Sequence, residues 1–438
     1  MDFIRNISEQ LVKWKNSKNR KPLILKGARQ VGKTWLMKEF GKTSFTDLAY
    51  FNFDEQPELA QFFEHSKDVS RIIKNLSVVH GSAIIPETTL IIFDEIQECL
   101  PALNSLKYFC ENAKEYPVVC AGSLLGITLG KGSSFPVGMV EFMEVYPLTF
   151  SEFLRGLDSS LADYIDNINK IEPIPDLFFN SLVEKFKMYF ISGGLPEAAK
   201  YLVFENDISL TEKALANILD SYSFDFAKHS TGKEFPKISA VWGSIPSQLS
   251  RENKKFLYQL AKTGARAREY EDALKWLISS GLVYNIFNCK KPALPLSAYD
   301  DLSAFKLYML DVGLLRQHSH LKPSAFKDGN RLFVEFKGAL TENYILQSLL
   351  AQFQVSPRYW TSEGKAEVDF LIQYDNDIIP IEVKSDENVR SKSLTYYNNL
   401  YKPKFRIRFS LKNFSFNEGL LNIPLFMADY TKKLLSLT

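Results

Sequence analysis

A glycine-rich loop near the start of the chain places the tightest constraint on its fold. The loop matches the pattern G-x-x-x-x-G-K-[ST] at every fixed position, and its residues are Gly27, Ala28, Arg29, Gln30, Val31, Gly32, Lys33 and Thr34. The apolar run Leu23–Leu25 comes directly before it, and a helical run over 35–40 follows. The backbone N–H groups of such a loop, together with the positive end of the following helix, wrap a triphosphate. The pattern therefore predicts a nucleoside-triphosphate site in an α/β fold, whereas a chance glycine turn would not need a strand and a helix around it.

Two adjacent carboxylates at the end of a second apolar strand predict hydrolysis as well as binding. The run 89–93 has a buried-strand pattern, and Asp94 and Glu95 follow it. As a parallel strand beside the first, it would bring Asp94 to a Mg²⁺ ion held by Thr34, and Glu95 to the attacking water. Lys33 would reach the β and γ phosphates. An isolated acidic pair is more often a solvated loop start, but this pair follows a phosphate-binding loop.

The first part of the chain alternates between strand candidates and helical or charged stretches, which is typical of a doubly wound parallel sheet. The expected strands are 22–26, 48–53, 89–94 and 117–121. Residues 1–20 carry apolar side chains at helical spacing and are expected to form an amphipathic helix beside the nucleotide site. Ser123 follows the last strand, level with the loop. There it would either sense the γ-phosphate as a catalytic residue or only cap a helix.

The middle of the chain predicts a winged helix. Residues 236–325 contain two helix candidates, at 254–261 and 267–279, and then a strand pair. Residues 240–325 hold twelve Lys and Arg against seven Asp and Glu, a net charge of +5. Such modules bind DNA or dock proteins, and both readings stay open here.

The last hundred residues contain a second candidate site. Period-two alternation over 367–372 and 379–384 predicts a hairpin that brings together Asp369, Glu382 and Lys384. The D-(x)n-E-x-K layout is that of the restriction-endonuclease-like fold. In that fold carboxylates hold Mg²⁺ against the scissile phosphate, and the lysine supports the attacking water.

One more acidic residue completes the candidate nuclease site. Glu342 lies in a helical pattern expected to begin at Thr341, and it is placed to be an additional metal ligand. A hairpin whose outer face is merely charged is the alternative reading of the same residues.

The length, charge and cysteine content limit which classes of protein the chain can belong to. The chain has 438 residues, 45% of them hydrophobic, which is enough for about three domains. The net charge of +2 does not by itself indicate a nucleic-acid partner. The four cysteines form no C-x-x-C pair, which argues against zinc ribbons and disulfides and favours a cytoplasmic location. No apolar stretch approaches the ~18 residues that span a bilayer, so we expect no membrane partner.

The motifs together resemble the prokaryotic AAA-type ATPases that carry a C-terminal domain of unknown function. The matching segments are G-A-R-Q-V-G-K-T, L-I-I-F-D-E-I-Q, A-G-S-L-L-G, Y-P-L-T-F-S-E-F, G-G-L-P-E, E-V-D-F and I-P-I-E-V-K. The resemblance runs nearly end to end and implies ATP and Mg²⁺ as cofactors. It implies an α/β P-loop core similar to archaeal-type and signal-transduction ATPases at 1–155, a helical lid at 156–235, a winged helix at 236–325 and a restriction-endonuclease-like domain at 326–438.

Two functions follow as expectations. The first is an Mg²⁺-dependent ATPase coupled to DNA binding or processing by its winged-helix and nuclease-like domains. The second is a nucleotide-controlled switch or scaffold whose inactive nuclease-like domain docks a protein partner. Homo-oligomers are common among such enzymes, and an arginine from a neighbour often completes the site. Within this chain Arg155, Arg251 and Arg266 are the candidates for that arginine.

Overall fold

The structure is a computed structural model, and it describes residues 2–64, 67–122, 136–251, 253–326, 331–353, 355–362, 364, 366–385 and 391–438, without the side chains of 331–336. These residues form two compact units. The N-terminal unit consists chiefly of residues 4–146, and the C-terminal unit chiefly of residues 147–438. Among the helices in the described parts, none combines the length and the apolar content that crossing a membrane requires.

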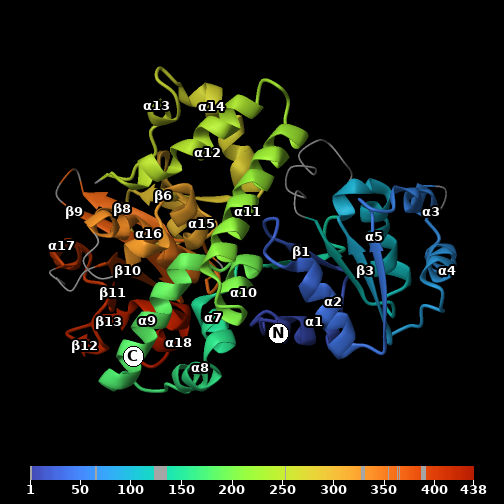
Figure 1. Ribbon diagram of the computed structural model, residues 1–438, viewed down its shortest axis with the longest axis horizontal. Helices are drawn as coiled ribbons and strands as arrows, with labels where there is room; N and C mark the ends of the chain where they lie inside the picture. Colours follow the sequence, from blue (N-terminus) through green and yellow to red (C-terminus); the bar gives the residue numbers. More distant parts are fainter. Residues whose placement is uncertain are drawn as a thin grey trace. The chain divides into compact units, whose positions relative to one another are not determined.

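A five-stranded sheet lies at the centre of the N-terminal unit (Figure 1), and all its neighbouring strands are parallel. The strands are β1 (Leu23–Lys26), β2 (Asp47–Asn52), β3 (Thr89–Asp94), β4 (Val118–Ala121) and β5 (Glu141–Glu144). Their order across the sheet is β2-β3-β4-β1-β5. The predicted parallel α/β sheet is thus confirmed, with four of its strands where the apolar runs placed them.

The strand order corrects one expectation about the nucleotide site. Asp94 ends β3, and β3 does not lie beside β1, because β4 pairs with both of them. Strand β5 was not predicted. It is an edge strand that pairs with β1 and is only partly buried. Its four residues, Glu-Phe-Met-Glu, form no continuous apolar run, so no buried-strand pattern marks them.

Helices cover both faces of this sheet. They are α1 (Ser8–Lys15), α2 (Lys33–Ser44), α3 (Gln61–Glu64), α4 (Val69–His80) and α5 (Leu100–Asn112), with short 3-10 turns at Pro57–Ala60 and Ile96–Glu98. On one face, side chains of α3, α4 and α5 pack with alternate residues of β1–β4 around Phe93. On the other, α2 contacts β2, β3 and β4, and α1 lies against α2. The predicted helix over 1–20 is therefore only one short helix, since it begins at Ser8 and ends at Lys15.

The C-terminal unit contains a mixed eight-stranded sheet in the order β12-β13-β11-β10-β9-β8-β6-β7. Its strands are β6 (Val283–Cys289), β7 (Asp300–Met309), β8 (Arg358–Ser362), β9 (Ala366–Tyr374), β10 (Asp377–Val383), β11 (Arg406–Ser410), β12 (Ser415–Asn417) and β13 (Leu420–Pro424). The predicted β9–β10 hairpin is present and antiparallel. Its core-facing residues Val368, Phe370, Ile381 and Val383 are buried, as the alternation predicts.

Helices precede and interrupt this sheet. They are α7 (Phe150–Leu157), α8 (Ser159–Asp166), α9 (Asp176–Ser192), α10 (Pro196–Phe204), α11 (Ile208–His229), α12 (Phe235–Leu249), α13 (Tyr258–Ala261), α14 (Ala267–Ser279), α15 (Val312–His318), α16 (Arg331–Leu350), α17 (Lys392–Tyr401) and α18 (Thr431–Leu435), with 3-10 turns at Leu296–Tyr299, Pro323–Phe326 and Leu425–Tyr430. Two predicted helix starts are wrong. The helix expected at 254–261 is only α13, and the one expected to begin at Thr341 is α16, where Thr341 lies inside and donates to the carbonyl of Lys337.

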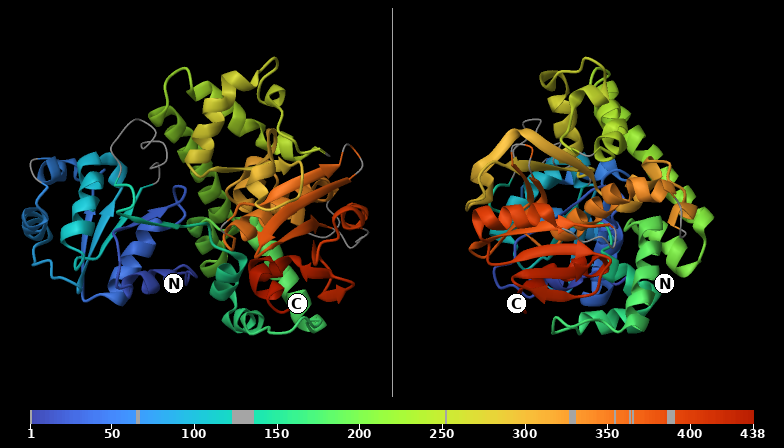
Figure 2. Two further views of the ribbon diagram at one scale, coloured as in Figure 1. Left: turned by 180° about the vertical axis from the view of Figure 1, so that it is seen from behind. Right: turned by 90° about the vertical axis from the view of Figure 1, so that its left-hand side faces the viewer.

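The division into lid, winged helix and nuclease-like domain stays a prediction, since the structure divides the chain into two compact units only. The helical segment that begins at α7 belongs to the same compact unit as the C-terminal sheet. In Figure 2 this green segment lies against the red C-terminal segment, where α7 and α9 contact the 3-10 turn Leu425–Tyr430. The expected wing, β6–β7, pairs with β8 at Asn288 and Tyr359 and so forms one edge of the eight-stranded sheet.

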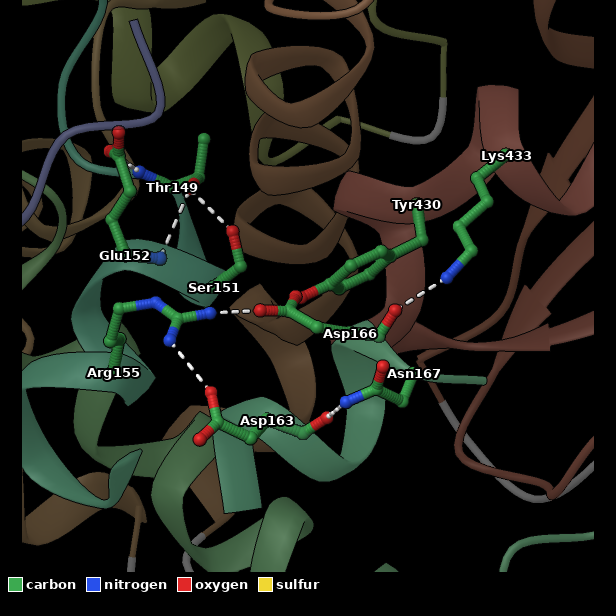
Figure 3. A network of polar contacts seen from close by, with 9 residues as sticks. All are labelled: Thr149, Ser151, Glu152, Arg155, Asp163, Asp166, Asn167, Tyr430 and Lys433. Carbon is green, nitrogen blue, oxygen red and sulfur yellow. Dashed lines mark hydrogen bonds and ion pairs between the residues drawn. The ribbon is translucent and has the colours of Figure 1, made fainter. Parts of the chain in front are cut away.

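A polar network joins the start and the end of this unit (Figure 3). Arg155 on α7 forms ion pairs with Asp163 and Asp166 on α8, and the 2.8 Å bond to Asp163 raises the pKa of its guanidinium. Asp166 also accepts the hydroxyl of Tyr430, and its carbonyl accepts the Lys433 ammonium at 2.5 Å. An arginine that completes a neighbour's site must be able to reach it, so this pairing favours a structural role for Arg155.

Candidate functional site

The backbone of the glycine-rich loop adopts conformations that only particular residues tolerate. Gly27 has φ 145°, and a Cβ there would lie 2.3 Å from the carbonyl oxygen of Val145. Gly32 has φ 93° and caps α2, which begins at Lys33. Gln30 also has a positive φ, 67°. The loop therefore turns sharply between β1 and α2, with the N-terminus of a twelve-residue helix at its end. This is the backbone geometry that wraps phosphate groups.

The Lys33 ammonium lies inside this loop. It donates to the carbonyl oxygens of Gly27 at 2.9 Å and Ala28 at 2.7 Å. Burial lowers the pKa of Lys33 to about 8, although the carboxylates of Glu95 and Asp94 act in the opposite direction. A buried lysine held by two carbonyls gains strongly from an anion, since the phosphates would replace the solvation that burial removed.

The Asp94 carboxylate at the end of β3 accepts hydrogen bonds from α2, from β2 and from the backbone of the next residue. Its Oδ2 accepts hydrogen bonds from the Thr34 hydroxyl at 2.7 Å and from the Tyr50 hydroxyl at 2.9 Å. Its Oδ1 accepts the backbone N–H of Glu95 at 3.1 Å. The two predicted metal-binding residues, Thr34 on α2 and Asp94 on β3, are thus in direct contact, although β4 lies between β3 and the strand β1 that precedes the loop. Tyr50 on β2 is a partner that the sequence did not indicate.

Glu95 has a strained backbone at the end of β3. Its φ is 49°, in the left-handed region that glycine favours, and this costs on the order of 1 kcal/mol or more. Its Oε2 accepts a hydrogen bond from the Gln97 side chain at 2.6 Å. Strain kept at such a position is typical of functional residues. The geometry fits the predicted role of Glu95 in orienting water.

The lowered pKa of Lys33 predicts a pH dependence of nucleotide binding. Only the charged ammonium attracts the phosphates, and in the free protein half of it is lost near pH 8. We expect the affinity for Mg²⁺·ATP to be constant at lower pH and to fall by roughly tenfold from pH 7 to pH 9. Isothermal titration across this range measures the change. An affinity that stays flat to pH 9.5 would contradict the pKa.

The candidate sensor, Ser123, lies outside the described residues. The described part of the preceding strand, β4, pairs with β1 at Ala121 and Leu25, and with β3 at Cys120 and Phe93. The role of Ser123 stays a prediction.

A second site lies in the C-terminal unit. A pocket of about 700 Å³ is lined by all four candidate nuclease residues, Glu342, Asp369, Glu382 and Lys384. They come from α16, β9 and the end of β10. The local hairpin places three of them, and the packing of α16 adds Glu342.

Three lysines face the carboxylates of this pocket. Lys254 pairs with Glu342, Lys306 pairs with Glu367, and Lys384 pairs with Glu382 at 2.6 Å. Burial alone would raise the pKa of Glu342, but Lys254 and Lys306 hold it below its ordinary value. Sequence reasoning missed Lys254 and Lys306, because each lies far along the chain from its partner and belongs to no local pattern.

Asp369 and the second oxygen of Glu382 are not paired with a lysine within the described residues, although Glu382 Oε1 is bonded to Lys384. Asp369 accepts the backbone N–H of Val383 at 2.8 Å. Burial, and then the nearby Glu342 carboxylate, raise the pKa of Asp369 to about 7. Glu382 is 4% exposed, and its Oε2 has no hydrogen-bond partner among the described residues. A buried oxygen without a partner favours a cation or a donor beside it.

The P-loop site and the C-terminal pocket differ in how well their oxygen ligands suit the expected Mg²⁺ ion. Thr34 and Asp94 offer the hard oxygen ligands that Mg²⁺ uses together with phosphates. In the pocket, Asp369 and Glu382 are suitable oxygen donors, whereas Glu342 is bonded to Lys254. Across the described ranges, no three His, Cys, Asp or Glu side chains are grouped so as to hold a metal ion.

Comparisons with known proteins divide the chain into three regions. Residues 19–154 match the family described as an AAA domain. Residues 183–325 and 337–427 match two families described as domains of unknown function, DUF8612 and DUF4143. No curated protein matches the chain. The N-terminal match and the parallel sheet support a P-loop core of the AAA type, in agreement with the predicted core.

Several solved structures are similar to the chain at low identity. The Walker-type ATPase of Pyrococcus abyssi is 13% identical over 72% of this chain and 95% of its own, with a TM-score of 0.45. The Aeropyrum pernix Orc1 protein, solved in complex with DNA, is 12% identical over 72% and 91%, with a TM-score of 0.28. The Thermotoga maritima RuvB branch migration motor is 14% identical over 66% and 90%, with a TM-score of 0.29.

Proposed function

We propose that the chain is an Mg²⁺-dependent ATPase whose catalytic residues are Lys33, Thr34, Asp94 and Glu95. The contact between the Thr34 hydroxyl and Asp94 Oδ2 at 2.7 Å carries the proposal. It joins the start of α2 to the end of β3, and so places a hydroxyl and a carboxylate where an ion could bridge them and a phosphate. The AAA-domain match of residues 19–154 supports the same activity.

Each of these residues has a distinct task. The loop backbone and the Lys33 ammonium hold the β and γ phosphates, since both present donors inside the loop. Thr34 and Asp94 hold the metal ion, which neutralises charge on the transferred group when bound. Glu95 orients the attacking water. Ser123, which follows β4 in the sequence, is proposed to contact the γ-phosphate.

We further propose that the C-terminal unit couples ATP hydrolysis to DNA. The order α12, α13, α14, β6 and β7 is compatible with a winged helix, although its hairpin belongs to a larger sheet. Arg266 and Arg268 are exposed at the start of α14, where they could contact phosphates. The pocket with Asp369 and Glu382 has the carboxylate-and-lysine chemistry of a phosphodiester-cleaving site.

The coupling is tested by measuring ATP hydrolysis with and without duplex, single-stranded and branched DNA. We expect one DNA form to stimulate turnover, and its binding to weaken steeply as salt rises, because phosphate contacts release counterions. Equal turnover with every DNA form, together with salt-insensitive or absent binding, would remove the DNA role. The ATPase assignment would survive that result.

Cleavage by the pocket has its own expected result. With Mg²⁺ or Mn²⁺ present, Asp369→Ala should lose at least about a hundredfold of any DNA cleavage, because a metal-binding carboxylate is removed. ATP hydrolysis in the absence of DNA should not change. Asp375→Ala, in the turn between β9 and β10, is the matched control. Cleavage that persists in Asp369→Ala would assign it to another site or to a contaminant.

A specific observation also favours the second candidate function, a nucleotide-controlled switch or scaffold. The three lysine–carboxylate pairs leave the pocket close to electrically neutral, which suits an inactive nuclease-like domain that docks a protein. Slow single-turnover hydrolysis, with protease sensitivity that changes between the ATP and ADP states, would support this candidate.

A further inference from the structure

A stretch of the C-terminal unit carries positive charge without any acidic residue. Residues 391–417 contain six Lys and Arg and no Asp or Glu, whereas the net charge of the whole chain is only +2. The stretch comprises α17, β11 and β12. Local charge, and not the net charge of the chain, sets the electric field at a surface. Such a stretch therefore favours a polyanionic partner.

The fold brings two loops of this region side by side. The backbone N–H of Arg406, at the start of β11, donates to the carbonyl of Gly419 at 2.8 Å, and its guanidinium donates to the carbonyl of Glu418. A Cβ on Gly419 would lie 3.1 Å from the carbonyl oxygen of Lys404. The loop that follows α17 is thereby held against the turn between β12 and β13.

Aromatic rings are exposed among these cations. Tyr401, the last residue of α17, is 40% exposed, and Phe416 on β12 is 44% exposed. The ring centroids of Phe405 and Phe416 are 6.2 Å apart, and the Lys404 ammonium lies 4.9 Å from the centroid of Phe405. Exposed rings beside ammonium groups can stack on bases while the ammonium groups contact phosphates.

The lysines of this surface differ from those of the pocket. Lys402 and Lys404 are exposed, and within the described parts of the chain neither forms an ion pair with a carboxylate. The three pocket lysines are each paired with a glutamate. Lys402 and Lys404 can therefore bind an anion without first leaving an acidic partner.

We propose that single-stranded DNA binds to a surface formed by the end of α17, the loop after it and β12. This α17–β12 surface consists of Tyr401, Lys402, Lys404, Phe405, Arg406 and Phe416. A single strand is favoured over a duplex, whose base faces are already stacked on one another and cannot reach the rings. An acidic protein would satisfy the lysines but would leave the stacking faces of the rings unused.

The α17–β12 surface is connected to the pocket by α17. Ser393, near the start of this helix, lines the pocket, and Tyr401 ends the helix. A helix of ten residues is about 15 Å long, so a strand bound at the surface lies within reach of the pocket. The inference rests on the DNA role proposed for the C-terminal unit, and adds the form of the DNA and the place where it binds.

The first test measures the charge contribution by fluorescence anisotropy of a labelled oligo-dT of about 20 nucleotides, with the full chain and without ATP. We expect Lys402→Gln/Lys404→Gln to weaken binding by at least about tenfold, and to lower the slope of log affinity against log salt by about 1.4, because two phosphate contacts are lost. Lys170→Gln/Lys213→Gln removes two exposed lysines elsewhere in the same unit and should change neither quantity.

The second test measures the contribution of the rings. Phe416→Leu should weaken oligo-dT binding by at least about fivefold and leave duplex binding unchanged, because leucine is apolar but has no flat face for a base. Phe416→Tyr keeps the ring and should bind as the wild type does. Thermal melts establish that the variants fold, and Tyr401→Leu replaces Phe416→Leu if the latter does not.

The remaining outcomes would overturn the inference in different ways. Wild-type affinity for oligo-dT in the lysine and Phe416 variants would remove the α17–β12 surface and leave the DNA role to Arg266 and Arg268. Absence of DNA binding by the wild type would remove the DNA role and the surface together. Poly-glutamate bound as tightly as oligo-dT would assign the surface to an acidic protein, and tenfold tighter binding of oligo-rU would assign it to RNA.

Discussion

Replacing Lys33 with alanine should abolish ATP hydrolysis and weaken Mg²⁺·ATP binding by at least about a hundredfold, since a buried charge-assisted contact to the phosphates is lost. The Lys33 ammonium is the cation bonded inside the loop, to Gly27 and Ala28. Turnover measured by phosphate release, and affinity measured by titration, check the two effects.

The matched control for this variant is Lys42→Ala. Lys42 is exposed near the other end of α2, so its removal changes the net charge equally without touching the loop. We expect wild-type turnover from it. Hydrolysis above one tenth of the wild-type rate in Lys33→Ala would mean that another site turns over ATP.

Replacing Glu95 with glutamine should separate binding from turnover. The amide keeps the size of the side chain but cannot polarise water as a carboxylate does, so kcat should fall by at least about a hundredfold with little change in affinity. The protein should then hold ATP without converting it, which filter binding with γ-labelled ATP measures. The left-handed backbone at Glu95 is retained, since glutamine has the same backbone preferences.

Glu98→Gln serves as the comparison for this variant. Glu98 is exposed in the 3-10 turn that Glu95 caps, so the same chemical change is made three residues along the chain. Wild-type turnover in Glu95→Gln would overturn its catalytic assignment. A loss of both turnover and nucleotide affinity would instead indicate damage to the Asp94 contacts.

Local patterns predicted much of the fold. Four strands of the N-terminal sheet and the β9–β10 hairpin follow from apolar runs and period-two alternation, because burial on a pleated surface requires those patterns. Strand order does not follow from them. A strand's own residues are equally apolar whichever neighbours it has, so the insertion of β4 between β1 and β3 left no signal.

Helix boundaries were predicted less well for a similar reason. α16 begins well before Thr341, and the helix expected at 254–261 is reduced to α13. Lys254 lies in a segment without helix, where its ammonium pairs with Glu342. A tertiary contact can override a weak local preference.

The nucleotide-binding chemistry of this protein was determined by the sequence alone, because a triphosphate is wrapped by contiguous residues, 27–34, and a contiguous stretch carries its own signature. Which charges oppose the carboxylates of the C-terminal pocket was decided only by the tertiary structure. Lys254 and Glu342 are 88 residues apart, and Lys306 and Glu367 are 61 apart. Only the packing of helix, sheet and connecting segment brings such residues within bonding distance, so no spacing along the chain reveals them.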